Sequence, residues 1–390
     1  ASPEHARIAP DQPLILFDHI RCAAFELPFR VGDGFGPIDP EVFLEALAET
    51  EVIHREGERW EWIADSYPAN AVSLRAVADG NFVVVDRSDG RQQIIAEVDY
   101  SAAALTLYEG AIHMVQSTPY QVETLDWDGR KAYVTRTHVD YYTDSIDFTK
   151  LKVLDRFDGG VAGRGDSHHG EVHVVRRVAG YKKIRYYTHE NIGYGPVNLP
   201  DQELHTTAVW WQLPQALLLR AFASKQDALD GFLGAAYALH IVATVAVMAD
   251  ARDLQKSVGN GDGSWFAIAD QSGRGQLRGS EGDPGVVELL QEFVPTVYLY
   301  DNFPGGVGLS EPLWQRQAEL VQRARELVQR CDCKAGCPAC VGPVLAAQEE
   351  DETSPRALAL RVLDLFDAEA CQHVPDVVVT SRDPMELLAP

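Results

Sequence analysis

Positive charge and cysteine are both scarce in this chain of 390 residues. It has 34 Lys and Arg against 58 Asp and Glu, a formal net charge of −24, and six cysteines. The acidic surplus repels phosphate backbones and anionic membrane surfaces on average, so any contact with nucleic acid must be local. So few cysteines argue against a secreted disulfide framework. We therefore expect a reducing, cytoplasmic compartment.

The motifs of the common enzyme classes are absent. The chain has no G-x-x-x-x-G-K-[ST], no G-x-S-x-G and no H-E-x-x-H, which are the patterns of P-loop, hydrolase and zinc-protease sites. It begins with Ala1 rather than Met, and no basic stretch followed by a long apolar run lies near its start. We expect a piece of a longer protein, without a secretory signal and without an ordinary catalytic motif.

One apolar run, residues 231–249, has the length of a membrane span and carries no charge. It consists mostly of Ala, Val and Gly, and it contains His240 and Thr244. Acidic residues, Asp230 and Asp250, flank it, with no cluster of Lys or Arg nearby. The run predicts a fully buried helix of a globular domain, and we expect no membrane partner.

The pattern of the chain predicts an α+β protein with several domains. Residues 37–50 have apolar side chains at helical spacing, and alternating segments follow on either side of Gly57 and of Asp89-Gly90. A helix followed by hairpins is compatible with a winged helix. We predict a winged-helix-like region at 1–90, a small β module at 91–160 and an α+β domain at 161–390.

Within the third region, glycine gives the strongest loop signal. Residues 158–170 contain five glycines among thirteen residues, and we expect a loop and a domain boundary there. Beyond it the sequence predicts six further elements: a hairpin at 171–188, two helices within 215–250, a strand at 295–300, a long helix at 311–330 and a last helix from 354 to about 370.

The strongest chemical motif is CDCKAGCPAC, at the end of the long helix. It places Cys331, Cys333, Cys337 and Cys340 in a C-x-C-x3-C-x2-C array. Four thiolates this close can complete a tetrahedral metal shell that has no open position, which is typical of structural zinc. The spacing is tighter than that of paired C-x2-C knuckles, so an iron–sulfur cluster is a rival interpretation. Unligated thiols are the other alternative.

A second motif, VHVVRRVAGYKKIRYYTHE, concentrates positive charge and aromatic rings in this acidic chain. Alternation along an extended strand would place Tyr181, Lys183, Arg185 and Tyr187 on one face, as in surfaces that bind single-stranded nucleic acid. The alternative is a solvated sheet face with half-buried tyrosines. The candidate nucleic-acid-binding residues are Arg176, Arg177, Tyr181, Lys182, Lys183, Arg185 and Tyr187.

Three weaker patterns accompany these motifs. The segment LYDNFPGGVGLSE, residues 299–311, reads as a strand, a Gly-rich turn and a helix, which favours a packing turn over an anion site. His168, His169 and His173 lie close together in the sequence. They could bind a metal, or they could simply be solvated. Asp250, Asp253 and Asp301 could serve a metal-dependent nuclease only if the fold brings them together. The spacing of these three aspartates in the sequence fits no known metal-binding pattern.

Three separated segments resemble one family. The opening LILFDHIRCAAFELPF, the central GYKKIRYYTHENIGYGPVNLPDQELHTTAVWW and the terminal YDNFPGGVGLSE with CDCKAGCPACV are similar to the region that follows the second RecA-like domain in MrfA-type superfamily II DNA helicases. The segments occur in the expected order, and the resemblance covers most of the chain. It is least between residues 81 and 157.

The resemblance implies an ATP-dependent 3′-to-5′ DNA helicase of DNA repair, whose C-terminal part has a winged-helix-like domain and a zinc-binding domain. It implies that the four cysteines hold structural Zn²⁺. Because this chain has neither a Walker A motif nor a DE-x-H box, ATP and Mg²⁺ would bind only in motor domains outside it. The expected partners are single-stranded DNA and the RecA-like motor domains of the same protein, with the chain itself monomeric.

Two functions follow from these patterns. In the first, the chain guides the single strand that leaves the motor and braces the motor through the zinc site. In the second, it is a structural or protein-interaction module without DNA affinity of its own.

Overall fold

A computed structural model describes residues 12–36, 38–72, 80–269, 275–279, 293–342 and 353–376. The chain forms two compact units. One comprises Phe148–Arg177 and the chain from Asp201 onward, and the other comprises Ile8–Asp147 with Val178–Pro200. Helices and strands are mixed in both units, which confirms the α+β class.

The first part of the Ile8–Asp147 unit is a winged helix. Gln12 caps the first helix by accepting the N–H of Ile15 at 2.7 Å. The side chains of Ile20, Leu44 and Trp60 form its core. The three strands lie in the order β1-β3-β2, and the elements are α1 (Pro13–Glu26), β1 (Phe29–Arg30), α2 (Glu41–Glu49), β2 (Ile53–Glu56), β3 (Arg59–Trp62) and η1 (Pro68–Ala71). The winged-helix prediction is confirmed.

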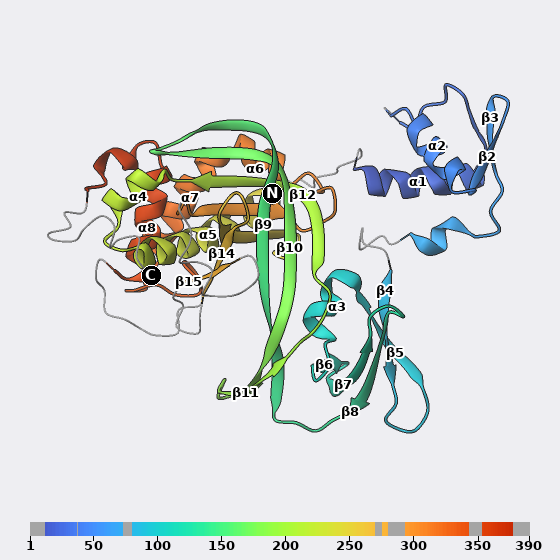
Figure 1. Ribbon diagram of the computed structural model, residues 1–390, viewed down its shortest axis with the longest axis horizontal. Helices are drawn as coiled ribbons and strands as arrows, with labels where there is room; N and C mark the ends of the chain where they lie inside the picture. Colours follow the sequence, from blue (N-terminus) through green and yellow to red (C-terminus); the bar gives the residue numbers. More distant parts are fainter. Residues whose placement is uncertain are drawn as a thin grey trace, which may run out of the picture. The chain divides into compact units, whose positions relative to one another are not determined.

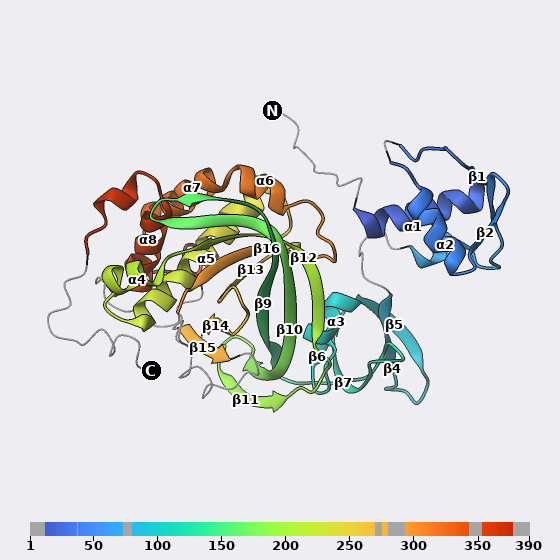
Figure 2. The same ribbon diagram turned by 45° about the horizontal axis from the view of Figure 1, so that its top comes forward.

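A five-stranded sheet follows in the same unit (Figure 2). Its order is β5-β4-β8-β7-β6, with β4 and β8 parallel, and Phe82, Val122 and Val134 are buried in its core. The hairpin of β4 and β5 spans residue 90, so the boundary expected there lies inside this sheet. The elements are β4 (Asn81–Asp86), β5 (Gln93–Asp99), α3 (Tyr100–Thr106), β6 (Ile112–Val115), β7 (Thr118–Asp126) and β8 (Lys131–Arg136).

Two long strands, β9 (Tyr141–Ala162) and β10 (Gly165–Arg185), occupy the segment expected to be a loop and a hairpin. Both of those expectations are wrong. The glycines lie in the strands because their neighbours leave no room for a side chain: a Cβ on Gly159 would lie 2.7 Å from Nδ1 of His168. The chain reverses at Gly163, where φ is +57°.

The unit that continues from Asp201 is built on an antiparallel sheet. Its strands follow the order β10-β12-β16-β13-β14-β15. Successive residues face opposite sides: Val209 and Trp211 pack against the helices, whereas Trp210 belongs to a second core with Tyr298 on the other face. The further strands of this unit are β12 (Gln202–Gln212), β13 (Leu254–Gly259), β14 (Trp265–Ala269), β15 (Gly275–Gly279) and β16 (Thr296–Asp301). Strand β11 (Asn191–Pro196) pairs with β10 and belongs to the other unit.

Helices cover one face of this sheet (Figure 1). The central helix α5 has the length and composition of a membrane span, and 56% of its 18 most apolar consecutive residues are buried. Two of its glycines allow α8 to approach: a Cβ on Gly231 would lie 2.8 Å from the carbonyl oxygen of Leu358. This packing supports the prediction of a buried helix. The helices are α4 (Gln215–Ala221), α5 (Lys225–Val247), α6 (Ser310–Gln315), α7 (Gln317–Arg330), α8 (Pro355–Phe366) and η3 (Ala370–His373).

Candidate metal centre and nucleic-acid surface

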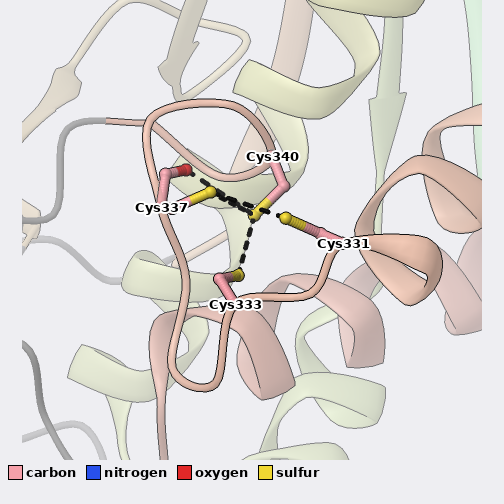
Figure 3. A group of neighbouring side chains, drawn as sticks. All are labelled: Cys331, Cys333, Cys337 and Cys340. Carbon is pink, nitrogen blue, oxygen red and sulfur yellow. Dashed lines mark hydrogen bonds between the residues drawn. The ribbon is translucent and has the colours of Figure 1, made fainter.

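The four cysteines meet at the end of α7 (Figure 3). Their side chains converge, and the four Sγ atoms all lie within 4.8 Å of one another. The Sγ atoms of Cys331 and Cys337, and those of Cys333 and Cys340, are 3.5 Å apart, and Cys337 and Cys340 are 3.7 Å apart. The spacing in the sequence therefore becomes a compact set of four sulfur ligands.

This arrangement fits one tetrahedral ion. Four thiolates at about 2.3 Å from zinc lie about 3.8 Å from one another, close to the measured separations. Sulfurs this close leave room for a single ion but not for a multi-iron cluster with its own sulfides, so the geometry favours zinc over the iron–sulfur alternative. A complete shell of four protein ligands leaves no open position, as in structural sites.

The thiols differ in how readily they ionise. Hydrogen bonds to Cys331, first from the backbone and then from the side chain of Cys333, lower the pKa of the Cys331 thiol to about 7. Burial raises the pKa of the thiols of Cys333 and Cys340. Because metal binding requires thiolates, hydrogen bonding favours the ligand form of Cys331, whereas burial opposes the ligand form of Cys333 and Cys340.

Arg356 joins the cysteine loop to the two helices beside it. Its guanidinium donates to the carbonyl oxygens of Val328 at 3.1 Å, Gln329 at 3.0 Å and Cys333 at 2.8 Å. Its backbone N–H donates to the carbonyl of Ala335 at 3.0 Å. The last carbonyls of a helix lack partners within it, so this one side chain at the start of α8 completes the end of α7.

Two local features shape the loop. Gly336 has φ of +125°, and a Cβ there would lie 2.7 Å from Cγ2 of Val341, so only glycine fits. Ser354 caps α8 by accepting the N–H of Ala357 at 3.3 Å, and Pro355 follows in the first turn. Helix α8 therefore starts at a defined residue beside the cysteines.

The weaker metal candidates do not assemble. Among the residues that the structure describes, only the four cysteines form a group of three or more potential ligand side chains. His168, His169 and His173 lie in β10, and Asp301 is buried and turned toward its own loop. The nuclease interpretation of Asp250, Asp253 and Asp301 therefore has no geometric support in the described residues.

The Gly-rich turn after β16 encloses a carboxylate. The Asp301 side chain is 0% exposed, and its Oδ2 accepts the N–H groups of Val307 at 2.8 Å and Leu309 at 3.0 Å. Burial raises the pKa of Asp301 to about 6, although these N–H groups act in the opposite direction. The loop donors thus bind a side chain of the protein itself, in agreement with a packing turn.

Tyr181, one of the predicted nucleic-acid-binding residues, lies in a hydrophobic core and not on the expected surface. It is 8% exposed, and its ring stacks on Tyr108 with centroids 5.0 Å apart. A Cβ on Gly195 would lie 2.3 Å from the ring of Tyr181, so the strand opposite leaves space for this tyrosine. The expected common face fails because the ring fills the core of its unit, and because the register shifts between Lys183 and Ile184.

Two of the arginines hold carboxylates. Arg177 makes a bidentate pair with Asp201 at 2.7 Å for both bonds. The Arg185 guanidinium lies 3.1 Å from Glu190 and 3.4 Å from Asp140. The positive charge of these two arginines is therefore largely offset by the neighbouring carboxylates.

Three other predicted residues retain the chemistry expected of a nucleic-acid surface. Lys182 and Lys183 form no salt bridge within the described ranges, and the Nζ of Lys183 lies 5.4 Å from the ring centre of Tyr141. Tyr187 is 98% exposed. Arg176 is not one of these three, because its guanidinium donates to Oδ1 of Asn302 at 3.2 Å. Lys182, Lys183 and Tyr187 are therefore the residues on which the hypothesis of a nucleic-acid surface now depends, and their role stays a prediction.

Sequence reasoning missed the roles of Asp301 and Arg356. Asp301 precedes three glycines with positive φ, Gly305, Gly306 and Gly308, a signal that the turn wraps around something small. Arg356 has no such signal, because its three carbonyl partners lie 23 to 28 residues away in the chain.

Comparison with known proteins agrees with this geometry. Residues 235–341 match the family described as the MrfA Zn-binding domain, a range that includes all four cysteines. Residues 8–77 match the winged helix domain of the ATP-dependent helicase HRQ1. The two matches correspond to the zinc-binding and winged-helix parts.

Similar proteins are helicases. The chain is 36% identical over 367 residues to the uncharacterized ATP-dependent helicase YprA of Bacillus subtilis, covering 94% of this chain and 44% of YprA. It is 24% identical over 343 residues to the ATP-dependent helicase HRQ1 of Saccharomyces cerevisiae, covering 84% of this chain and 29% of that protein. The chain thus spans less than half the length of these relatives.

Solved structures lead to the same family. The DUF1998 helicase MrfA bound to DNA matches with a TM-score of 0.54 and 35% identity, over 94% of this chain and 44% of that one. MrfA in a second crystal structure matches with a TM-score of 0.56 and 31% identity, over 90% and 45%. The chain is similar to the part of the MrfA-type helicases that carries their winged-helix and zinc-binding domains.

Proposed function

We propose that this chain is the C-terminal accessory part of an ATP-dependent 3′-to-5′ DNA helicase that acts in DNA repair. It guides single-stranded DNA and braces the motor through a structural zinc site. The observation that carries the proposal is the match of 94% of the chain to a helicase whose structure is bound to DNA. RecA-like motor domains, with their ATP and Mg²⁺, belong to the remainder of the protein, in the cytoplasm.

Cys331, Cys333, Cys337 and Cys340 would hold the zinc. The ion would supply a fixed tetrahedral link between the end of α7 and the loop that leads toward α8. The residues of the chain do the rest: Arg356 binds the carbonyls at the end of α7, and Ser354 caps α8. The site is a brace because it offers no open coordination position for a substrate.

DNA binding would use the hairpin of β10 and β11. Lys182 and Lys183 supply cations for phosphates, and Tyr187 supplies a ring for a base. The rest of a chain with net charge −24 repels DNA, so the strand would be confined to this hairpin.

A titration of the purified chain with a fluorescently labelled single-stranded oligonucleotide, followed by anisotropy at two salt concentrations, tests the proposal. We expect binding that weakens as salt increases, because phosphate contacts release counterions. The control for simple charge attraction is a twelve-residue peptide that carries the same negative charge as the oligonucleotide but has no bases. No binding at low salt would contradict the role in guiding DNA.

A second candidate is a structural or protein-interaction module without DNA affinity of its own. The burial of Tyr181 and the pairing of Arg177 with Asp201 favour it, because both reduce the surface available to DNA. In that case the zinc content is unchanged and the titration shows no binding, while the intact helicase still binds DNA through its motor domains. A monomeric chain is expected under both functions.

A further inference from the structure

The hairpin of β10 and β11 ends in a turn that presents a tyrosine to solvent. Tyr187 is 98% exposed and has φ of +66°, and His189 has φ of +56°. A left-handed backbone is sterically unfavourable for a residue with a large side chain, and glycine or asparagine is the usual choice there. Folding therefore gives no reason for a tyrosine at this position, and such outliers concentrate at functional sites.

The turn is held in place from within. The N–H of Arg185 donates to the carbonyl of Glu190 at 2.9 Å, and the N–H of His189 donates to the carbonyl of Arg185 at 3.1 Å. The Arg185 guanidinium pairs with the carboxylates of Glu190 and Asp140. The backbone that carries Tyr187 is thus anchored by several bonds, while the ring itself lies in solvent.

Charge in the hairpin favours a polyanion. Lys182 lies opposite Tyr194 of β11, and Lys183 lies opposite Gly193. Neither lysine forms a salt bridge within the part of the chain that the structure describes. The two carboxylates beside the turn are already paired with Arg185, so they oppose an approaching phosphate less than free carboxylates would.

The shape of the turn selects one part of a DNA molecule. Bases inside a duplex are stacked on both faces, and only the last base pair presents a free face. One ring on a projecting turn can cover one such face. A strand that lies along a groove is instead held by a row of successive rings. Of the two exposed tyrosines of the hairpin, Tyr187 (98% exposed) lies in the turn itself, whereas Tyr194 (60% exposed) lies in β11.

We propose that Tyr187 stacks on the terminal base pair where a DNA duplex meets a single strand, while Lys182 and Lys183 contact the phosphates of that strand. This contact rests on the proposed function and names the DNA feature that the hairpin recognises, the duplex junction.

The test measures the affinity of the whole chain for two DNA probes by anisotropy. One probe is a duplex with a single-stranded 3′ tail, and the other is the tail alone. The wild-type chain and Tyr187→Phe are expected to prefer the junction by about fivefold to tenfold, the lower end of what one stacking contact supplies. Tyr187→Ala and Tyr187→Gly are expected to lose that preference. Tyr67→Ala, at another exposed tyrosine, is the control and keeps it.

A second readout locates the contact. 2-Aminopurine placed in the terminal base pair is expected to change its emission with the wild-type chain and with Tyr187→Phe, but not with Tyr187→Ala. Tyr187→Gly separates stacking from misfolding, because glycine fits the left-handed backbone and removes only the ring.

The outcomes distinguish the two proposals. A junction preference that persists in Tyr187→Ala and Tyr187→Gly, or that disappears in Tyr187→Phe, overturns the stacking contact. Binding of the tail without any junction preference overturns this contact and leaves the strand-guiding function intact. Failure to bind either probe overturns both.

Discussion

The carboxylate of Asp301 at the end of β16 accepts the backbone N–H of Leu309, eight residues later, at 3.0 Å. The N–H of Val307 donates to the same oxygen at 2.8 Å. The side chain of the strand thereby occupies the place that an external anion would take in a glycine-rich turn. This internal anion fixes the path of the chain from the sheet into α6.

Replacement of Asp301 by alanine is expected to destabilise the fold by about 1–3 kcal/mol, because the N–H groups of Val307 and Leu309 would be buried without an acceptor. Urea unfolding followed by circular dichroism measures the change. Asp262→Ala is the matched control, since Asp262 is exposed and accepts the N–H of Ser264 at 2.8 Å. Equal losses in the two variants would contradict the role of burial.

The stability of the chain should depend on the protonation of Asp301. Its pKa is raised from 3.8 to about 6 in the folded state, so between these pH values the folded state holds a proton that the unfolded state has released. This carboxyl group therefore lowers stability as pH rises from about 4 to 6, by at most about 1.4 kcal/mol per pH unit. The measurement is the difference in unfolding free energy between wild type and Asp301→Asn across that range. Parallel pH profiles would disprove the assignment.

Removal of one zinc ligand should unfold the junction of α7 and α8. For Cys340→Ser we expect loss of the metal and a destabilisation on the order of 5 kcal/mol, because the binding energy of a structural zinc contributes to folding. Elemental analysis with thermal unfolding checks both. Cys371→Ser, at a buried free cysteine outside the cluster, should keep one zinc per chain. Iron in place of zinc in the wild-type chain would refute the single-zinc interpretation.

Arg356 should stabilise the same region by a separate route. Arg356→Lys is expected to cost about 1–3 kcal/mol, since an ammonium group lacks the planar fork that reaches the carbonyls of Val328, Gln329 and Cys333 together. Hydrogen exchange should accelerate at the end of α7 while zinc content stays constant. Arg323→Ala removes an exposed ion pair with Glu319 and should change stability by less than about 1 kcal/mol.

Reversal of charge at Lys182 and Lys183 should weaken the binding of single-stranded DNA. Loss of two phosphate contacts is expected to reduce the slope of log affinity against log salt by about 1.4. The control is the double change Arg91→Glu with Lys131→Glu, which alters the net charge equally at two exposed residues outside the hairpin, whereas Lys182 and Lys183 are partly buried. If both double variants weaken binding to the same extent, general repulsion rather than a local surface explains the effect.

Local signals in the sequence predicted much of the fold. The apolar spacing of residues 37–50 and the Asp89-Gly90 turn correspond to α2 and to the hairpin of β4 and β5. The cysteine spacing led directly to the metal site, because its four ligands lie within ten residues and their meeting needs no long-range contact. Such features depend on neighbours in the chain, which a sequence displays.

The predictions from the sequence were wrong where contacts with residues far away in the chain determine the structure. Glycine usually marks loops, yet Gly159 and Gly170 lie in long strands because His168 and Asp155 occupy the space beside them. Tyr181 is aromatic and follows a basic stretch, yet Tyr108 and Gly195 provide a buried site for its ring. In each case the deciding contact comes from another strand, and alternation along one strand cannot reveal it.

Loss of the metal would affect helix α5 as well as the stability of the zinc site. The small residues of α5 allow close packing against α8, which starts beside the cysteine loop, and the helix is long and apolar enough to cross a membrane by length and composition. A chain that loses its metal and releases α8 would expose this surface to water, where such helices aggregate or are captured by chaperones. Binding of the metal would therefore help to keep this long apolar helix buried.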